Sequence, residues 1–131
     1  MKNSIYVIAV SLFVLTLTSC KKNLDDVLVG TWKITEIKKE PTSGTSTTLN
    51  NTGTITFIAG GTGSYSIDYG TGAISGSLTW TAASNNATVA ISAGILNPVT
   101  GQYTVLTNKP KLQVWQQINT NGDKFTYRLE K

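Results

Sequence analysis

Few residues in this 131-residue chain could carry out catalysis, because it contains no histidine and a single cysteine. Without histidine, a Ser-His-Asp triad and a histidine general base are both excluded. One cysteine cannot form an intramolecular disulfide, and a structural zinc site needs several cysteine or histidine ligands. The sequence therefore predicts no metal site, no cofactor and a fold stabilised by apolar burial and backbone hydrogen bonds alone.

The remaining acid–base groups are seven carboxylates. A glycosidase needs two of them to converge on one cleft. Only Glu36 and Asp68 lie inside early predicted strands, away from turns and the tail. Alternation sends Asp68 outward, whereas Glu36 shares the parity of Trp32 and either points inward or is solvated. The glycine-rich runs lie between strands, with no helix to receive a phosphate. We therefore expect no enzymatic activity.

The charge of the chain does not indicate a nucleic-acid partner. It carries 11 basic and 7 acidic residues, a formal charge of +4. Three lysines, Lys2, Lys21 and Lys22, flank the N-terminal apolar run and are typical of targeting. No group of basic residues is interleaved with aromatic residues, as a phosphate-tracking surface requires. Binding to nucleic acid is not predicted, and the sequence does not determine the oligomeric state.

The N-terminus has the pattern of a secretory signal peptide over residues 1–19. One lysine precedes thirteen mostly apolar residues, Ile5 to Leu17. As a helix they would extend roughly 20 Å, short of the roughly 30 Å hydrocarbon core of a bilayer. A charged start, a short apolar stretch and a small-residue exit are typical of a cleaved signal and not of a membrane span.

The exit of this segment, Leu17-Thr18-Ser19-Cys20, resembles the lipobox of bacterial lipoproteins. The resemblance implies cleavage before Cys20, a diacylglycerol on its sulfur and an acyl chain on the new amino group. Two or more chains make a durable membrane anchor where one does not. Membrane attachment through acylated Cys20 is therefore expected, with residues 20–27 as a tether. The expected membrane is the outer membrane, and the sequence does not determine which leaflet holds the anchor. The KKNLDD run is either a loose surface-export signal of the Bacteroidetes type or an ordinary linker.

From Val29 onward the chain is rich in Gly, Thr, Ser and Asn, and apolar residues alternate with polar ones. Period-two alternation predicts half-buried strands. No segment after Cys20 has convincing helical periodicity. The eight predicted strands are Thr31–Ile37, Thr54–Ile58, Ser64–Tyr69, Ile74–Ala82, Thr88–Ser92, Gln102–Leu106, Lys111–Gln117 and Phe125–Glu130.

Eight strands joined mostly by short turns favour an antiparallel meander that closes on itself, since closure removes exposed sheet edges. The fold class is all-β, a small eight-stranded up-and-down barrel, with a two-sheet sandwich as the alternative. The side chains predicted to point inward are Trp32, Ile34, Ile55, Phe57, Tyr65, Ile67, Tyr69, Ile74, Leu78, Trp80, Val89, Ile91, Tyr103, Val105, Leu112, Val114, Phe125, Tyr127 and Leu129.

The first predicted strand opens with Gly30-Thr31-Trp32, a Gly-x-Trp sequence that resembles the first strand of the lipocalins. Together with the GTITFIAGGTGSYSI hairpin and the closing KFTYRLEK, it is similar to the short lipocalin-like lipoproteins of Bacteroidetes, over residues 28–131. In lipocalins an arginine of the last strand packs over that tryptophan. The resemblance implies this closing role for Arg128, the only arginine, whereas strict alternation puts Arg128 on the outer face.

Two functions from different classes follow. The first is a barrel that binds a small apolar or amphipathic ligand in its interior or at its mouth. The resemblance to lipocalins implies that residues 38–51, the longest polar connection, form a lid over it. The predicted ligand-binding aromatic residues are Trp32, Phe57, Tyr65, Tyr69, Trp80, Tyr103 and Tyr127, which could equally form a packed core.

The second function is a surface interaction module for a protein or glycan, with a packed interior. Its principal residue is Trp115, because strict alternation sends Leu112 and Val114 inward and therefore Trp115 outward. A bulge at this point would instead turn Trp115 into the core. An internal cavity of several hundred Å3 would favour the ligand barrel, and a filled interior would exclude it.

Overall fold

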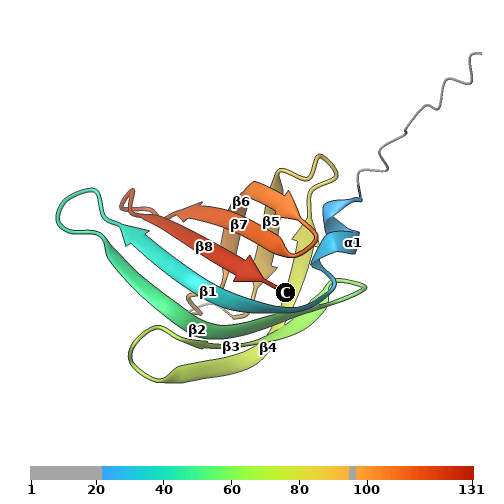
Figure 1. Cartoon of the computed structure of the whole chain (residues 1–131), viewed down its shortest axis with the longest axis horizontal. Helices are drawn as coiled ribbons and strands as arrows, with labels where there is room; N and C mark the ends of the chain where they lie inside the picture. Colours follow the sequence, from blue (N-terminus) through green and yellow to red (C-terminus); the bar gives the residue numbers. More distant parts are fainter. Residues whose placement is uncertain (1–21, 95–96) are drawn as a thin grey trace, which may run out of the picture.

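The computed structural model describes residues 22–94 and 97–131. Each strand pairs antiparallel with the next and the last pairs with the first, so the sheet closes into a barrel (Figure 1). This confirms the eight-stranded up-and-down barrel and excludes the sandwich. The elements are α1 (Leu24–Leu28), β1 (Gly30–Glu40), β2 (Thr47–Ile58), β3 (Thr62–Asp68), β4 (Ala73–Ala82), β5 (Thr88–Ser92), β6 (Gly101–Lys109), β7 (Leu112–Ile118) and β8 (Lys124–Glu130).

The predicted signal peptide (residues 1–19) and Cys20 lie outside the described residues. Within the described ranges, no helix is both long and apolar enough to cross a bilayer. All eight predicted strands are present, and the largest difference is in β2, which begins at Thr47 and not at Thr54. Most of the predicted lid, residues 38–51, is therefore strand, and only a short connection remains between Glu40 and Thr47.

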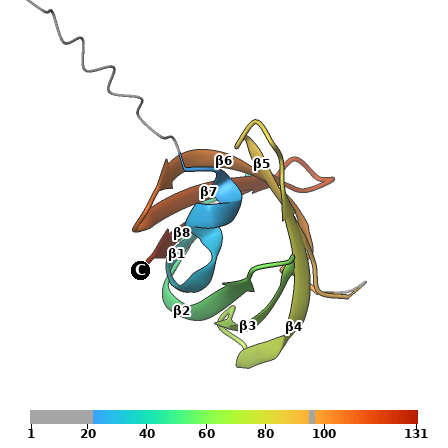
Figure 2. The same cartoon turned by 90° about the vertical axis from the view of Figure 1, so that its right-hand side faces the viewer.

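The short helix α1 was not predicted, and it changes the domain boundary. Leu24, Val27 and Leu28 are buried, at the i, i+3 and i+4 spacing that puts three side chains on one helix face. This face packs into one end of the barrel, which Figure 2 shows in end-on view. Asp25 and Asp26 lie in the first turn, where negative charge is favourable. Leu24 to Val27 thus belong to the folded domain, and the predicted tether is correspondingly shorter.

The face of β7 is the main error in the predicted core. Leu112 and Val114 were expected inside, but Gln113 is fully buried and Trp115 is 2% exposed. The ladder to β8 is regular and sets Trp115 opposite Tyr127 and Gln113 opposite Leu129, so all four share the inner face. Burying the indole removes more apolar area from water than burying Val114 would. Trp115 is therefore a core residue by the parity of β7, and the β-bulge opposite it lies in β6, between Val105 and Thr107.

A β-bulge in β1 between Ile34 and Glu36 changes the parity of the residues that follow. Ile37 is buried as a result, and Glu36 is not placed on the inner face with Trp32 and Ile34. The inward position considered for Glu36 is therefore wrong. A bulge shifts one residue of the strand relative to its partner, and the alternation of the sequence does not reveal where this occurs.

Ile74 was also predicted inside, but it is 37% exposed. β4 pairs with β5 only from Thr79 to Ala82, whereas it pairs with β3 from Ala73 to Thr79. The first half of β4 therefore has no strand on its β5 side, and the β3–β4 hairpin extends outward from the barrel (Figure 1). Ile74 lies on this overhang, beyond the packed core.

Candidate functional site

The barrel interior is a packed aromatic core and not a ligand cavity. The seven aromatic residues predicted to bind a ligand are buried, except Tyr69, which is partly buried. Phe57 packs against Trp80 and Trp115 with ring centroids 5.2 and 5.7 Å apart. The space left among the inner side chains is about 10 Å3, while one water molecule needs about 10–15 Å3. This excludes binding of a ligand inside the barrel in this conformation.

The end of the barrel opposite α1 is closed by the β5–β6 connection. Val99 is 2% exposed, and its carbonyl oxygen accepts a hydrogen bond of 2.7 Å from the Tyr103 hydroxyl. The amide of Asn97 donates to the Tyr65 hydroxyl from the same connection. These contacts cover the core where the β3–β4 hairpin diverges from β5. They give the hydroxyls of Tyr65 and Tyr103 structural partners.

Three inner tyrosines remain neutral at physiological pH. Burial raises the pKa of Tyr69, Tyr103 and Tyr127 well above that of a solvated phenol, and the neighbouring tyrosines contribute further. Among the described side chains, only the Tyr69 hydroxyl is fully buried without a hydrogen-bond partner. A phenol held protonated in this way cannot act as a general base at neutral pH.

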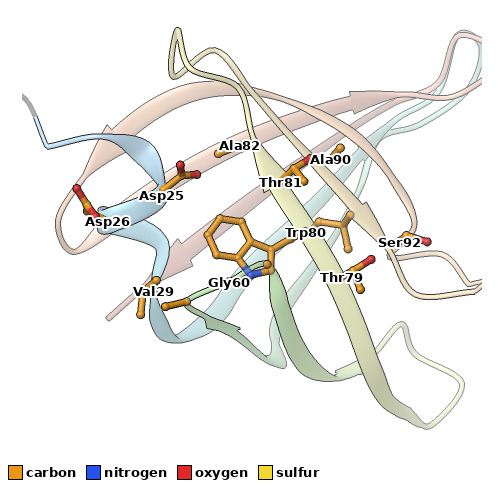
Figure 3. A pocket seen from close by; sticks show the side chains of 13 residues that line it. Asp25, Asp26, Val29, Gly60, Thr79, Trp80, Thr81, Ala82, Ala90 and Ser92 are labelled. Atoms are coloured by element: carbon orange, nitrogen blue, oxygen red, sulfur yellow. The ribbon is translucent and has the colours of Figure 1, made fainter.

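A concave site lies outside the barrel interior, in a notch of about 740 Å3 beside α1. Figure 3 shows the Trp80 indole lying in the notch between Asp25 on α1 and Gly60 of the β2–β3 turn. The Trp80 Nε1–H donates to the carbonyl oxygens of Ile58 (3.2 Å) and Thr62 (2.9 Å), which fixes the ring. The notch is lined by Asp25, Asp26, Val29, Ala59, Gly60, Gly61, Thr79, Trp80, Thr81, Ala82, Ala90, Ile91 and Ser92.

The notch exists because the end of β4 extends past the start of β3, its antiparallel neighbour. The β3–β4 ladder stops at the pair Thr62 and Thr79. One further hydrogen bond of 2.8 Å follows, from the backbone N–H of Trp80 to the carbonyl oxygen of Gly61. From there to Ala82, β4 pairs only with β5. The neighbouring position is occupied by α1, which does not continue the sheet. A short free edge of β4 therefore borders the notch above the Trp80 ring.

The walls of the notch combine three kinds of group. Asp25 and Asp26 supply exposed carboxylates, and among the described residues neither forms an ion pair. Thr79, Thr81 and Ser92 supply hydroxyls, while glycine and alanine keep the space between them open. An aromatic floor with carboxylates on one wall suits an amphipathic molecule that carries a positive or hydrogen-bond-donating group. Nothing in this arrangement provides a nucleophile with an adjacent base.

The two carboxylates considered for catalysis do not form a pair. Asp68 stabilises a turn, since its Oδ1 accepts hydrogen bonds from the N–H groups of Gly70 (2.7 Å) and Gly72 (3.1 Å). Glu36 lies on β1, and Asp68 ends β3, with β2 between these two strands. In the described part of the chain, no three acidic or cysteine side chains are grouped closely enough to hold a metal ion.

The predicted contact between Arg128 and Trp32 is not formed. Arg128 is exposed and its Nε donates to Glu130 at 2.7 Å. The cation over the Trp32 ring is Lys131, with Nζ 4.4 Å from the ring centroid. Lys131 Nζ also donates to the carbonyl oxygens of Val27 and Val29, and the Trp32 Nε1–H donates to Leu28 at 2.7 Å. The last residue of the chain therefore secures α1 to the first strand.

Replacing Lys131 by alanine is expected to lower the free energy of unfolding by about 0.5 to 2 kcal/mol, because the cation–π contact is lost. The matched variant Arg128→Ala removes an exposed ion pair and should change it by less than about 1 kcal/mol. Urea unfolding followed by circular dichroism measures both. A larger effect for Arg128→Ala than for Lys131→Ala would contradict the assignment of Lys131 as the closing residue.

Residues 28–130, which are most of the chain, match the family described as a lipocalin-like domain. The chain belongs to the lipocalin-like family. No curated protein matches it significantly. This lipocalin-like domain also resembles a solved structure described as a redesigned β-barrel, at 18% identity and a TM-score of 0.52, covering 85% of this chain and 96% of that one. At such identity the likeness supports the barrel fold alone.

The lipocalin-like barrel thus keeps the predicted aromatic residues as its core. Two of them also line surface hollows: Trp80 lines the notch, and Tyr65 lines a hollow of about 430 Å3 beside the β5–β6 connection. Trp115 is buried and cannot serve as a surface contact. The sequence pattern did not indicate the notch, its carboxylates Asp25 and Asp26, or the open edge of β4. The only available signal was the Leu24, Val27, Leu28 spacing of α1.

Proposed function

We propose that this protein is a non-enzymatic, membrane-anchored lipoprotein whose lipocalin-like barrel binds a small amphipathic ligand in the notch beside α1. The anchor is acylated Cys20, and we expect it in the outer membrane, in either leaflet. The observation that carries the binding proposal is the position of the open space: the interior is filled, and the notch of about 740 Å3 lies over Trp80. Small-molecule sites of about 300–1,000 Å3 are usual.

The alternative of a surface interaction module loses its principal residue, because Trp115 is in the core. The binding of a ligand within the barrel is also not supported, since no sizeable space remains there. The filled interior excludes the predicted ligand barrel, and the notch beside α1 is a separate binding site that the sequence did not predict. The carboxylates of Asp25 and Asp26 favour ligands with an amine over ligands with a carboxylate, by charge complementarity.

The test uses the chain from Lys21 onward and two dansyl-labelled probes of equal chain length, an alkylamine and a fatty acid. We expect saturable binding of the amine probe and binding of the fatty acid that is at least about tenfold weaker, a difference of about 1.4 kcal/mol. The double change Asp25→Asn with Asp26→Asn should reduce this preference. Probe fluorescence, excited directly, reports both affinities.

Occlusion of the notch provides the structural control. Ala90 is exposed on β5 and lines the notch, so Ala90→Phe should fill it and abolish probe binding without disturbing the core. The matched variant Thr104→Phe places the same ring on the exposed outer face of β6, outside the notch. Probe binding that survives Ala90→Phe, or that is lost equally in Thr104→Phe, would contradict binding in the notch.

A further inference from the structure

Four exposed lysines lie at the α1 end of the barrel. Lys22 precedes α1, Lys109 and Lys111 flank Pro110 in the β6–β7 turn, and Lys131 ends the chain. We call Lys22, Lys109, Lys111 and Lys131 the lysine band. They come from three separate parts of the sequence, so their proximity is a property of the fold.

Backbone and groove contacts make the lysine band continuous. The backbone N–H of Lys131 donates to the Lys111 carbonyl oxygen at 3.2 Å, which joins the C-terminus to the β6–β7 turn. A groove of about 620 Å3 is lined by Lys22 together with Asn108 and Pro110 of that turn. Partial burial lowers the pKa of Lys131, and the nearby positive charge of Lys22 lowers it further. Like charges are thus held close together.

The carboxylates at this end of the barrel do not neutralise the lysine band. Glu130 is paired with Arg128 at 2.7 Å. Asp25 and Asp26 line the notch and form no ion pair among the described residues. None of the band lysines forms an ion pair with a described carboxylate. Lys22, Lys109 and Lys111 therefore carry charges that no described carboxylate neutralises, whereas the Lys131 ammonium group is already held by the Trp32 ring and two backbone carbonyl oxygens.

Apolar side chains are exposed beside these lysines. Leu106 is 53% exposed and lines the same groove as Lys22, together with the partly buried Val105. Lysines mixed with exposed aliphatic side chains fit the boundary between lipid headgroups and acyl chains. A free acidic peptide would use the charges but not these apolar groups.

The direction of the chain also brings this end to the membrane. Leu24 is held in the barrel end, only four residues after Cys20, a span of at most about 14 Å in an extended chain. A tether that continued to Val27 would have allowed about 25 Å. If Cys20 carries acyl chains in a bilayer, α1 must therefore lie within reach of the headgroups.

We propose that the lysine band is a docking face for anionic lipid headgroups in the membrane that anchors the protein. This inference rests on the lipid anchor of the proposed function. It orients the barrel with its α1 end toward the bilayer and the β3–β4 hairpin away from it. The notch, which shares the α1 end, then opens close to the headgroup layer.

The first experiment measures orientation on a synthetic anchor. Because Cys20 is the only cysteine, a chain beginning at Cys20 can be coupled uniquely to a maleimide lipid in vesicles. Vesicles of phosphatidylcholine, with or without phosphatidylglycerol, are then treated with an amine-acetylating reagent. We expect Lys109 and Lys111 to be acetylated several-fold more slowly on the anionic vesicles. Lys38 and Lys124, at the opposite end of β1 and β8, should be unchanged and act as internal references.

The second experiment omits the anchor. The chain from Lys21 onward should co-sediment with phosphatidylglycerol-containing vesicles at low salt and be released at high salt, where charges are screened. Lys109→Gln with Lys111→Gln should lower the partition coefficient by roughly thirtyfold, as expected for the loss of two lysines near an anionic surface. The matched pair Lys38→Gln with Lys124→Gln makes the same charge change at the far end and should have little effect.

Equal protection of both ends, or protection that does not depend on phosphatidylglycerol, would overturn the proposal. So would equal effects of the two double variants. The synthetic anchor makes the first test independent of whether Cys20 is acylated in the cell. A negative result would therefore remove the docking face and leave the lipid anchor and the notch to be tested separately.

Discussion

Replacing Trp115 by alanine is expected to lower the free energy of unfolding by about 3 to 5 kcal/mol, the usual range for a fully buried aromatic residue. Trp115 is 2% exposed and packs against Phe57 and Tyr103 with ring centroids 5.7 and 5.8 Å apart. Its removal would leave a void among rings that already fill the interior. Urea unfolding followed by circular dichroism measures the change without depending on tryptophan fluorescence.

Two further variants make this prediction specific. Ile118→Ala alters the same strand at a side chain that is 62% exposed, and should change stability by less than about 0.5 kcal/mol. Trp115→Phe keeps a ring but leaves the Gln113 Oε1 without the Nε1–H donor now 3.2 Å away. An unpaired buried acceptor costs about 1 to 3 kcal/mol. Equal effects of Trp115→Ala and Ile118→Ala on the free energy of unfolding would contradict the burial of Trp115.

Replacing Leu24 by alanine is expected to lower the free energy of unfolding by about 2 to 5 kcal/mol. Leu24 is fully buried at the end of the barrel, in the core that also contains Val27 and Leu28. Its backbone N–H donates to the side chain of Asn86 at 2.8 Å, and this bond is kept in the variant. The change therefore isolates the packing of one side chain.

The neighbouring change Asn23→Ala, at an exposed position just before α1, is the matched control. We expect it to alter stability by less than about 0.5 kcal/mol. If residues before Leu28 were only a tether, Leu24→Ala and Asn23→Ala would be equally silent in urea unfolding. A silent Leu24→Ala would also remove the short connection on which the orientation at the membrane depends.

The strands themselves were predictable because alternation is a local property. Val89 with Ile91, and Tyr127 with Leu129, show the period-two pattern in the sequence and are buried as expected. Closure also followed, since eight short strands in series leave two sheet edges that closure removes. The aromatic residues could be recognised as inward, but not whether they enclosed a space or filled it.

Inward and outward assignments failed where the sequence supports both. In β7, Leu112 and Val114 compete with Gln113 and Trp115 for the inner face, and one residue of slip exchanges the two sets. The outcome depends on Tyr127 and Leu129 in the neighbouring strand, which set the register. Gln113 is tolerated inside because its amide donates to Asn108 and to the Lys109 carbonyl oxygen.

The sequence by itself determined the eight strands, their antiparallel order and the absence of the histidine that a Ser-His-Asp triad or a histidine general base requires. The lipid anchor at Cys20 remains a prediction. Only the tertiary structure decided that the interior is filled, that Lys131 and not Arg128 covers Trp32, and that a notch opens beside α1. These features depend on where strands end relative to one another and on contacts between residues far apart in the chain, such as Val27 and Lys131. Local alternation carries no information about either.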